Sequence, residues 1–236
     1  MKVVEQFGSI QGEGKYLGVP SYFIRTTGCN LRCTWKNPDN TITKCDTPYT
    51  SFNPEKGKDF DNEQLERTLK YSPIEHIVLT GGEPLIQPDI AQVVEKLNEQ
   101  AKYQVTIETN GTVFKDIPNA FMSISPKLSN SYAQEHSKDR QLHQKNNVYM
   151  ENISKWMKTN DYQLKFVVNE RKDMEEIYNL VRSLDVPHNK VYLMPQGITT
   201  EQFKNKENFI FEEAMKGGFN YTPRLHIELF GNKRGI

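Results

Sequence analysis

The chain has 236 residues, 36% of them hydrophobic and 25% charged, and its 30 basic side chains are balanced by 30 acidic ones. A chain of this length can bury a core without disulfides, and its zero net charge excludes a global field that would drive binding to nucleic acid or to an anionic membrane. The sequence has no apolar run long enough for a transmembrane helix, its polar start predicts no signal peptide, and its three cysteines then indicate a reducing cytoplasm.

Strand-type apolar runs alternate with segments of helical period along the chain. The predicted strands are residues 22–24, 76–79, 104–108, 121–124, 164–168 and 191–194. Helical stripes are predicted over 90–97, with Asp89 as an N-terminal charge or cap, and over 174–184. Strands separated by helices imply parallel pairing, so we expect one α/β domain over residues 1–236.

Two segments look added to this framework. Residues 36–44 are polar and contain the turn signal Asn37-Pro38-Asp39-Asn40. Residues from about 132 to 147 are polar and charged with little periodicity, which is typical of a surface excursion. We expect both segments to be insertions.

The three cysteines fall in the loop after the first predicted strand. Three residues separate Cys29 from Cys33, and eleven separate Cys33 from Cys45. Three thiolates can hold three irons of a [4Fe–4S] cluster and leave the fourth iron open. With a histidine they would instead make a closed zinc site, but the nearest one in sequence, His76, lies in an apolar strand where core packing is its ordinary role. The spacing alone leaves a cluster, a zinc site and unrelated buried thiols open.

Polar or glycine-rich residues recur around the carboxyl ends of the predicted strands. The stretches are 9–14 before the cysteine loop, 80–84, 108–112, 125–127 and 194–197. One such stretch is ordinarily a turn. Five of them would converge on one rim of a parallel sheet, which indicates a shared site.

These motifs together resemble the radical S-adenosylmethionine (SAM) enzymes, and within them the family of 7-carboxy-7-deazaguanine synthases of the queuosine pathway. The resemblance runs from Val4 to Ile236, and its most specific parts are Cys29 with Cys33 and the stretches 11–14, 45–47, 81–84, 108–111 and 226–235. The superfamily has two residues between the second and third cysteines, so the nine residues 36–44 are expected to loop out. A longer loop costs little closure entropy and need not prevent cluster binding.

The resemblance implies an α/β fold, an incomplete parallel (β/α)6-type barrel with reduced helices. It also implies a lyase that converts 6-carboxy-5,6,7,8-tetrahydropterin to 7-carboxy-7-deazaguanine with release of ammonia. The implied cofactors are a [4Fe–4S] cluster, SAM and Mg²⁺, and the implied partners are a flavodoxin or similar electron donor and a second copy in a homodimer, with no nucleic acid and no membrane. The alternatives are another radical SAM enzyme, such as a glycyl-radical activase, and a non-catalytic zinc-binding module.

The resemblance further implies roles for individual residues, none of them as a catalytic acid or base. The expected metal ligands are Cys29, Cys33 and Cys45 for the cluster and Thr47 for Mg²⁺. The residues expected to bind SAM are Gly81, Gly82, Glu83, Thr109, Asn110, Ser125, Lys127 and Gln196. Those expected to bind the substrate are Gln11, Gly12, Glu13, Gly14, Arg25, His226 and Ile236. Three of these residues have a purely structural alternative. Arg25 could lie on the surface, His226 could pack within a core strand, and Thr47 could cap a turn.

Overall fold

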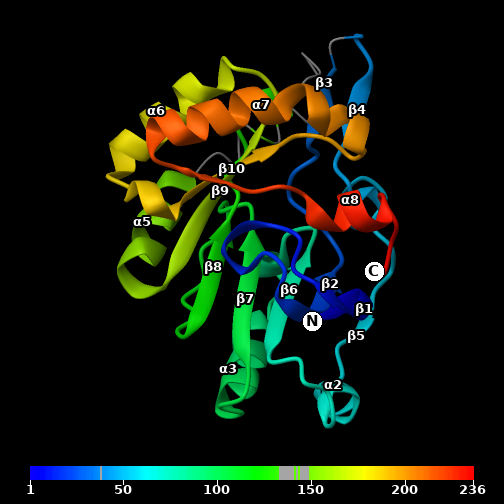
Figure 1. The fold of residues 1–236 in the computed structure, drawn as a ribbon. Coiled ribbons are helices and arrows are strands. Elements are labelled where there is room, and N and C mark those ends of the chain that lie inside the picture. The colour runs from blue at the N-terminus through cyan, green and yellow to red at the C-terminus, as the bar shows by residue number, and fades with distance from the viewer. Residues whose placement is uncertain (38, 133–140, 142, 144–148) are drawn as a thin grey trace.

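The computed structural model describes residues 1–37, 39–132, 141, 143 and 149–236. Its centre is a nine-stranded sheet in the order β11-β10-β9-β8-β7-β6-β2-β1-β5 (Figure 1). The strands of this sheet are β1 (Lys2–Ile10), β2 (Pro20–Thr26), β5 (Lys58–Asp59), β6 (His76–Gly81), β7 (Gln104–Thr109), β8 (Ala120–Ile124), β9 (Tyr162–Val168), β10 (Val191–Pro195) and β11 (Asn220–Tyr221). A separate hairpin consists of β3 (Thr34–Lys36) and β4 (Ile42–Lys44).

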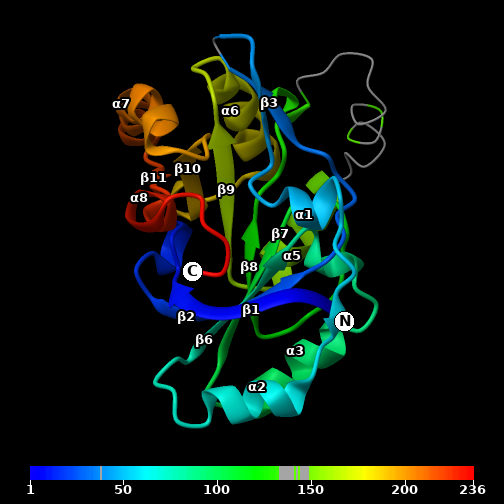
Figure 2. The same ribbon diagram turned by 90° about the vertical axis from the view of Figure 1, so that its right-hand side faces the viewer.

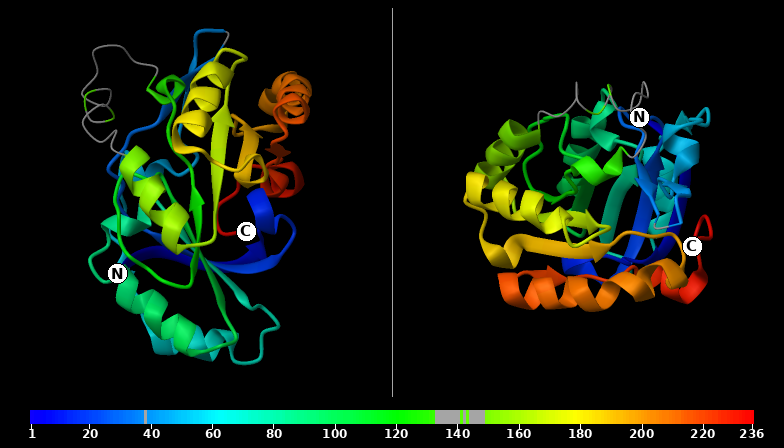
Figure 3. Two further views of the ribbon diagram at one scale, coloured as in Figure 1. Left: turned by 90° about the vertical axis from the view of Figure 1, so that its left-hand side faces the viewer. Right: turned by 90° about the horizontal axis from the view of Figure 1, so that it is seen from above.

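Neighbouring strands from β2 through β6, β7, β8, β9 and β10 to β11 pair in parallel. The six predicted strands correspond to β2 and β6 to β10, so the expectation of an α/β fold with parallel pairing is confirmed. At one edge β1 pairs antiparallel with β2 and with β5, which the sequence reasoning missed. The sheet curves around an interior but does not close on itself, which makes it an incomplete barrel (Figure 3).

The outside of the curved sheet is covered by the helices α2 (Asn62–Leu69), α3 (Ile90–Glu99), α5 (Tyr149–Thr159), α6 (Asp173–Leu184) and α7 (Thr200–Gly217) (Figure 3). The short helices α1 (Pro48–Ser51) and α8 (Leu225–Phe230) instead carry residues that face the inside of the sheet. The fully described connection between β7 and β8 contains no helix, which agrees with the expected reduction of the helices. Asp89 precedes α3 as predicted, but its carboxylate pairs with the amine of Met1 and makes no side-chain cap bond.

The core lies between the sheet and these helices. The parallel strands are buried almost throughout, as expected for a sheet covered by crossover helices. His76 is 4% exposed and its two ring nitrogens lie 2.7 Å from Ser21 Oγ and from Thr106 Oγ1. Burial lowers the pKa of His76 to about 4, so the predicted core role of this histidine is confirmed.

The segment 36–44 forms much of the β3–β4 hairpin. Thr34 pairs with Lys44, Trp35 with Thr43, and Lys36 with Ile42. The extra residues therefore extend outward as a two-stranded ribbon rather than as an open loop. Of the second expected insertion, residues 133–140, 142 and 144–148 lie outside the described residues. Within the described chain, no helix has the length and apolarity needed to cross a membrane.

Candidate active site

A cavity of about 500 Å³ opens inside the curved sheet, at the carboxyl ends of the parallel strands. It collects nearly all the side chains singled out in the sequence. The predicted residues that line it are Gln11, Gly12, Glu13, Arg25, Cys29, Cys33, Cys45, Thr47, Gly81, Gly82, Thr109, Asn110, Ser125, Lys127, Gln196, His226 and Ile236. Gly14 and Glu83 lie outside the lining.

The three cysteines are free thiols that share one wall of the cavity. The hairpin brings the second and third together, since the amide of Cys45 donates to the carbonyl of Cys33 over 3.0 Å at its base. Leu31, Trp35 and Val167 pack around the sulfurs in a small apolar cluster. Burial raises the pKa of Cys29 to about 12 and holds the pKa values of Cys33 and Cys45 above their usual range. These thiols therefore need a cation beside them to become thiolates.

A single zinc ion and an iron–sulfur cluster place different demands on three sulfurs. A tetrahedral zinc ion with Zn–S bonds of about 2.3 Å requires sulfurs about 3.8 Å apart. Among the described residues, no group of three His, Cys, Asp or Glu side chains converges on a single ion. An iron–sulfur cube places each ligand on a different iron and so spaces its sulfurs more widely. His76, committed to Ser21 and Thr106, is not available as a fourth zinc ligand.

Two glycines at the end of β6 let the chain pass beside the cysteine loop. A Cβ on Gly82 would lie 1.9 Å from the carbonyl oxygen of Gly28 and 2.9 Å from Cys29 Cβ. A Cβ on Gly81, whose φ is +129°, would lie 2.3 Å from the carbonyl oxygen of Thr26. Both positions therefore require glycine so that the end of β6 can pack against the loop that carries the sulfurs.

Glu83 is fully buried behind the cavity wall. Its carboxylate accepts hydrogen bonds from Thr109 Oγ1 over 2.8 Å, the amide of Asn110 over 2.7 Å and the amide of Leu85 over 3.0 Å. Burial raises the pKa of Glu83 to about 7. In this structure the side chain holds the end of β7 in place, and Thr109 and Asn110 present themselves to the cavity.

Glu13 is the centre of a buried network of charges. Its carboxylate pairs with Lys165 Nζ and, over 3.0 Å, with Arg224 Nε, and both cations have side chains less than 10% exposed. Burial alone would raise the pKa of Glu13, but Lys165 and Arg224 hold it well below its usual range. The carboxylates of Glu13 and Glu108 keep the pKa of Lys165 above its usual value in spite of burial.

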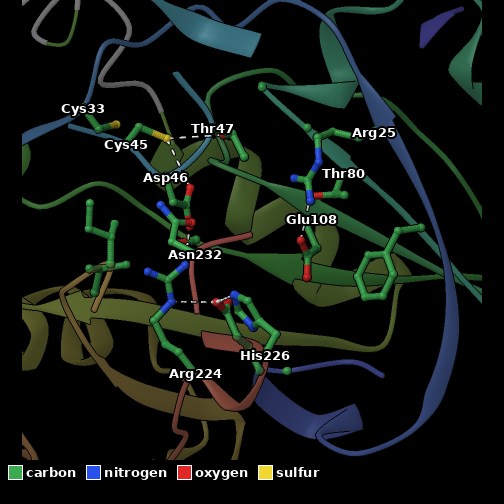
Figure 4. Close-up of a pocket in the computed structure, with 18 of the residues that line it drawn as sticks. Arg25, Cys33, Cys45, Asp46, Thr47, Thr80, Glu108, Arg224, His226 and Asn232 are labelled. Carbon is green, nitrogen blue, oxygen red and sulfur yellow. Dashed lines mark hydrogen bonds and ion pairs between the residues drawn. The ribbon is translucent and has the colours of Figure 1, made fainter. Parts of the chain in front are cut away.

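Arg224 connects this network to the cysteine loop. Besides Glu13, its guanidinium donates to the carboxylate of Asp46 (Figure 4) and to the carbonyl of Gly197. Asp46 stands next to Cys45, so the third sulfur and the charge network are neighbours (Figure 4). Sequence reasoning gave no role to Lys165 or Arg224. The available signal was a lysine inside the apolar strand β9 and an arginine just before the tail.

Glu108 is a second acceptor on the cavity wall. It receives hydrogen bonds from Gln11 Nε2 over 3.1 Å and from Thr80 Oγ1 over 2.7 Å. Figure 4 shows Glu108 and Thr80 beside Arg25. The sequence motif 108–111 contains Glu108, but only Thr109 and Asn110 of it were predicted to bind a ligand.

The C-terminal segment folds back from α8 toward β1 (Figure 2). The Arg234 guanidinium donates to Glu5 over 3.0 Å and to the two oxygens of Glu55 over 2.7 and 2.8 Å. Glu5 also accepts from Arg25 Nε over 2.6 Å and from the Tyr49 hydroxyl over 2.7 Å. One carboxylate thus orients Arg25 and anchors the tail that brings Ile236 to the cavity.

His226 lies on the helix α8 and not in a strand, so the core-strand alternative is wrong. Its ring packs against Gly12, where a Cβ would lie 2.1 Å from Nδ1, and its Nε2 is 4.0 Å from Glu13. Burial lowers the pKa of His226, which makes it a neutral donor or acceptor at the cavity wall. Arg25 was expected either at the substrate site or on the surface. Its side chain faces the cavity and is 17% exposed.

Thr47 precedes α1, and its hydroxyl makes no cap bond to that helix. The hydroxyl oxygen faces the cavity at 3.5 Å from Cys45 Sγ. The Thr47 hydroxyl therefore does not cap the turn, and it faces the cavity, where a ligand could contact it.

The chain is similar to known proteins over most of its length. The model of the radical SAM superfamily matches residues 23–205. A 7-carboxy-7-deazaguanine synthase from Rhodopirellula baltica is 38% identical over 236 residues, covering 99% of this chain and 88% of that protein. One from Halobacterium salinarum is 34% identical over 244 residues, covering 98% and 91%. The crystal structure of QueE from Escherichia coli superposes with a TM-score of 0.65 at 22% identity, over 95% of this chain and 94% of that one, and shows the same fold.

Proposed function

The chain belongs to the radical SAM superfamily and, within it, to the family of 7-carboxy-7-deazaguanine synthases, and from this membership we propose that it converts 6-carboxy-5,6,7,8-tetrahydropterin to 7-carboxy-7-deazaguanine with release of ammonia. The placement of Cys29, Cys33 and Cys45 on the wall of one cavity with a charged, hydrogen-bonding opposite wall carries this proposal. The reaction needs both halves, because a one-electron source must lie beside a site that orients an anionic heterocycle.

Three thiols on one cavity wall match the ligand set of a [4Fe–4S] cluster, in which three thiolates hold three irons and the fourth iron stays open. Cys29, Cys33 and Cys45 would be the ligands. When bound, the cluster and SAM together supply a 5′-deoxyadenosyl radical that can take a hydrogen atom from the substrate. The chain's own contribution on this side is the apolar packing of Leu31, Trp35 and Val167 around the cysteines.

On the SAM side we propose that Lys127 and Ser125 bind the carboxylate or ribose oxygens. Lys127 Nζ donates to Ser125 Oγ over 2.7 Å and forms no ion pair with a described carboxylate. Its charge is therefore free to meet an anionic group of a ligand. Thr109, Asn110 and the backbone at Gly81 and Gly82 complete the same part of the wall.

On the substrate side the cavity supplies what an anionic planar heterocycle requires. Arg25 offers N–H groups that Glu5 does not use, and a guanidinium fork suits a carboxylate. Glu13 and Glu108 offer carboxyl oxygens that suit ring N–H groups, and Gln11, the backbone of Gly12 and His226 lie on the same wall. We propose that the terminal carboxylate of Ile236 completes this set.

We propose that Thr47 is a protein ligand of Mg²⁺. The ion keeps most of its water and prefers oxygen, so one hydroxyl together with substrate oxygens suffices. In Thr47→Ala, the dependence of turnover on Mg²⁺ should weaken, whereas Thr159→Ala on the exposed end of α5 should leave it unchanged. A Mg²⁺ dependence that is identical in both variants removes Thr47 from the ligand set.

We further propose that the enzyme is a homodimer that works in the cytoplasm with a flavodoxin or similar electron donor. A reducing compartment suits three cysteine ligands without a disulfide among them. We regard residues 1–236 as one domain in which 36–44, seen here as a hairpin, and about 132–147 are insertions.

The decisive experiment is anaerobic turnover with the reconstituted protein, the carboxylated tetrahydropterin, SAM, Mg²⁺ and a reductant. We expect 7-carboxy-7-deazaguanine and ammonia, and neither from Cys45→Ser. A protein that forms 5′-deoxyadenosine without the deazapurine acts on another substrate, such as the protein substrate of a glycyl-radical activase. A colourless protein that binds zinc and no iron is the non-catalytic alternative.

A further inference from the structure

Lys206 is a buried lysine behind the cavity that the proposed reaction does not use. It lies on α7 and is 8% exposed. Its ammonium donates to Asn169 Oδ1, to the carbonyl of Gln196 and to Gln196 Oε1, each over 2.8 Å. The three N–H groups of the ammonium thus meet three neutral oxygens, two of them on the same glutamine.

This contact determines how the Gln196 amide is turned. A side-chain amide has an accepting oxygen and a donating nitrogen, and an ammonium can only donate. Burial lowers the pKa of Lys206 to about 8, so the ammonium form predominates at neutral pH. Lys206 therefore holds the Gln196 oxygen toward itself and turns the NH₂ group away.

The freed NH₂ group belongs to a residue of the cavity wall. Gln196 is 2% exposed, follows β10 and lines the cavity. Its Nε2 donates to no group within the described part of the chain, although its oxygen and its backbone amide are both hydrogen-bonded. Because Gln196 lines the cavity, this NH₂ group is free to donate to a ligand that brings an acceptor.

The neighbouring amide shows the same effect with its partner present. Asn169 also accepts from Lys206 through its oxygen, and its Nδ2 then points to the carbonyl of Lys36 over 3.3 Å. One ammonium thus orients two amides. The first reaches the hairpin beside the cysteines, and the second faces the cavity.

We propose that Lys206 is a positioning residue that fixes Gln196 as a hydrogen-bond donor to an acceptor nitrogen of the adenine ring of SAM. The inference rests on the proposed function, because it takes SAM as the ligand of this cavity. The methionine end of SAM must lie at the cysteines after β2, and β10 is separated from β2 by four strands of the sheet, which suits the opposite end of the molecule.

The test measures SAM binding by calorimetry on the anaerobic, cluster-loaded protein, together with iron content and thermal unfolding. Lys206→Met lets the amide turn over, and we expect SAM to bind on the order of tenfold more weakly. Lys206→Arg can only donate and should recover much of the affinity. Gln196→Glu keeps an oxygen for Lys206 but presents a second acceptor to adenine, so it should weaken SAM binding at least as much while the protein stays as heat-stable as the unmodified chain.

A mutant cycle separates positioning from general structural damage. In a Gln196→Ala background, Lys206→Met should weaken SAM binding little further. The proposal would be overturned if Lys206→Met caused an equal additional loss in that background. It would also be overturned if Gln196→Glu bound SAM as tightly as the unmodified chain, or if only pterin binding were weakened. Gln196→Glu decides the donor question even if Lys206→Met fails to fold. A protein that shows all the expected SAM effects but forms no deazapurine refutes the proposed substrate and supports this inference.

Discussion

Glu13→Gln tests how far the carboxylate shared by two buried cations stabilises the fold. The side chains of Lys165 and Arg224 are 6% and 8% exposed, and that of Glu13 is 11% exposed. Glutamine has the same shape and keeps one accepting oxygen, so the substitution removes the charge and little else. It leaves Lys165 without an ion-pair partner among the described residues, while Asp46 still balances Arg224.

The expected loss follows from this geometry. Removing one member of a buried pair costs about 3–5 kcal/mol, because the other charge stays buried and uncompensated. The retained hydrogen bond and Asp46 reduce that cost, so we expect the free energy of unfolding to fall by about 2–3 kcal/mol. The pKa of Glu13 lies well below that of an unfolded glutamate, so its contribution is complete above about pH 4.3 and is lost only as the pH falls further. The deficit of the variant should therefore be constant between pH 6 and 8.

Denaturant unfolding under anaerobic, reducing conditions measures this loss. Glu212→Gln is a matched control, because Glu212 pairs with Arg171 over 3.0 Å on an exposed surface where its side chain is 64% exposed. We expect no measurable change in the control. Adding Lys165→Met to Glu13→Gln should restore part of the stability, since it removes the unpaired charge.

Equal unfolding free energies for Glu13→Gln and Glu212→Gln would refute this account of the site. A Lys165→Met addition that deepens the loss would do the same, because it would show that packing and not charge balance sets the stability. In either case the cations would need another counter-charge.

Three further predictions concern the sulfurs, the tail and the core. Cys45→Ser should lose most of the iron and sulfide after anaerobic reconstitution, and iron retained at the level of the unmodified chain would contradict the ligand assignment. Arg234→Gln frees the tail from Glu5 and Glu55, so it should raise the KM for the pterin several-fold while SAM binding stays unchanged. A short C-terminal extension should also raise this KM. A KM unaffected by both changes would show that the tail does not reach the substrate. Because burial lowers the pKa of His76 to about 4, the unfolded chain takes up a proton that the folded chain excludes, and the unfolding free energy should fall as the pH drops from about 6.5 to 4. His76→Gln should flatten that dependence, and an unchanged slope would assign it to other groups.

The parallel strands were predictable because each carries a local signal. Buried strands such as β6 and β9 are short apolar runs, and helical stripes separate them from the next strand. Parallel pairing then places the carboxyl ends on one rim, which is why motifs far apart in sequence could be assigned to one cavity. The edge strand β1 gave no such signal, because most of its residues are only half-buried and its buried and exposed positions do not alternate regularly.

The charge network was not predictable, because its members meet only in the folded chain. Glu13 lies 152 residues from Lys165 and 211 residues from Arg224. A lysine inside the apolar run of β9 is a local signal, but it does not identify the carboxylate that Lys165 meets. For Glu83 the motif predicts contact with a ligand, and the fold adds what the motif could not show, which is that its carboxylate accepts hydrogen bonds from Leu85, Thr109 and Asn110.

The hairpin explains how extra residues between Cys33 and Cys45 are compatible with a shared cluster. The register pairs Thr34 with Lys44, so Cys33 and Cys45 form the next step of the ladder, joined by the 3.0 Å bond from amide to carbonyl. The separation of the two cysteines is set at this end of the ribbon and not by the number of residues beyond it. An open loop of the same length would have to fix the third sulfur by tertiary contacts alone, whereas the paired strands fix it through the backbone. Sequence spacing overstates the distance between the sulfurs because it counts residues that run outward and back.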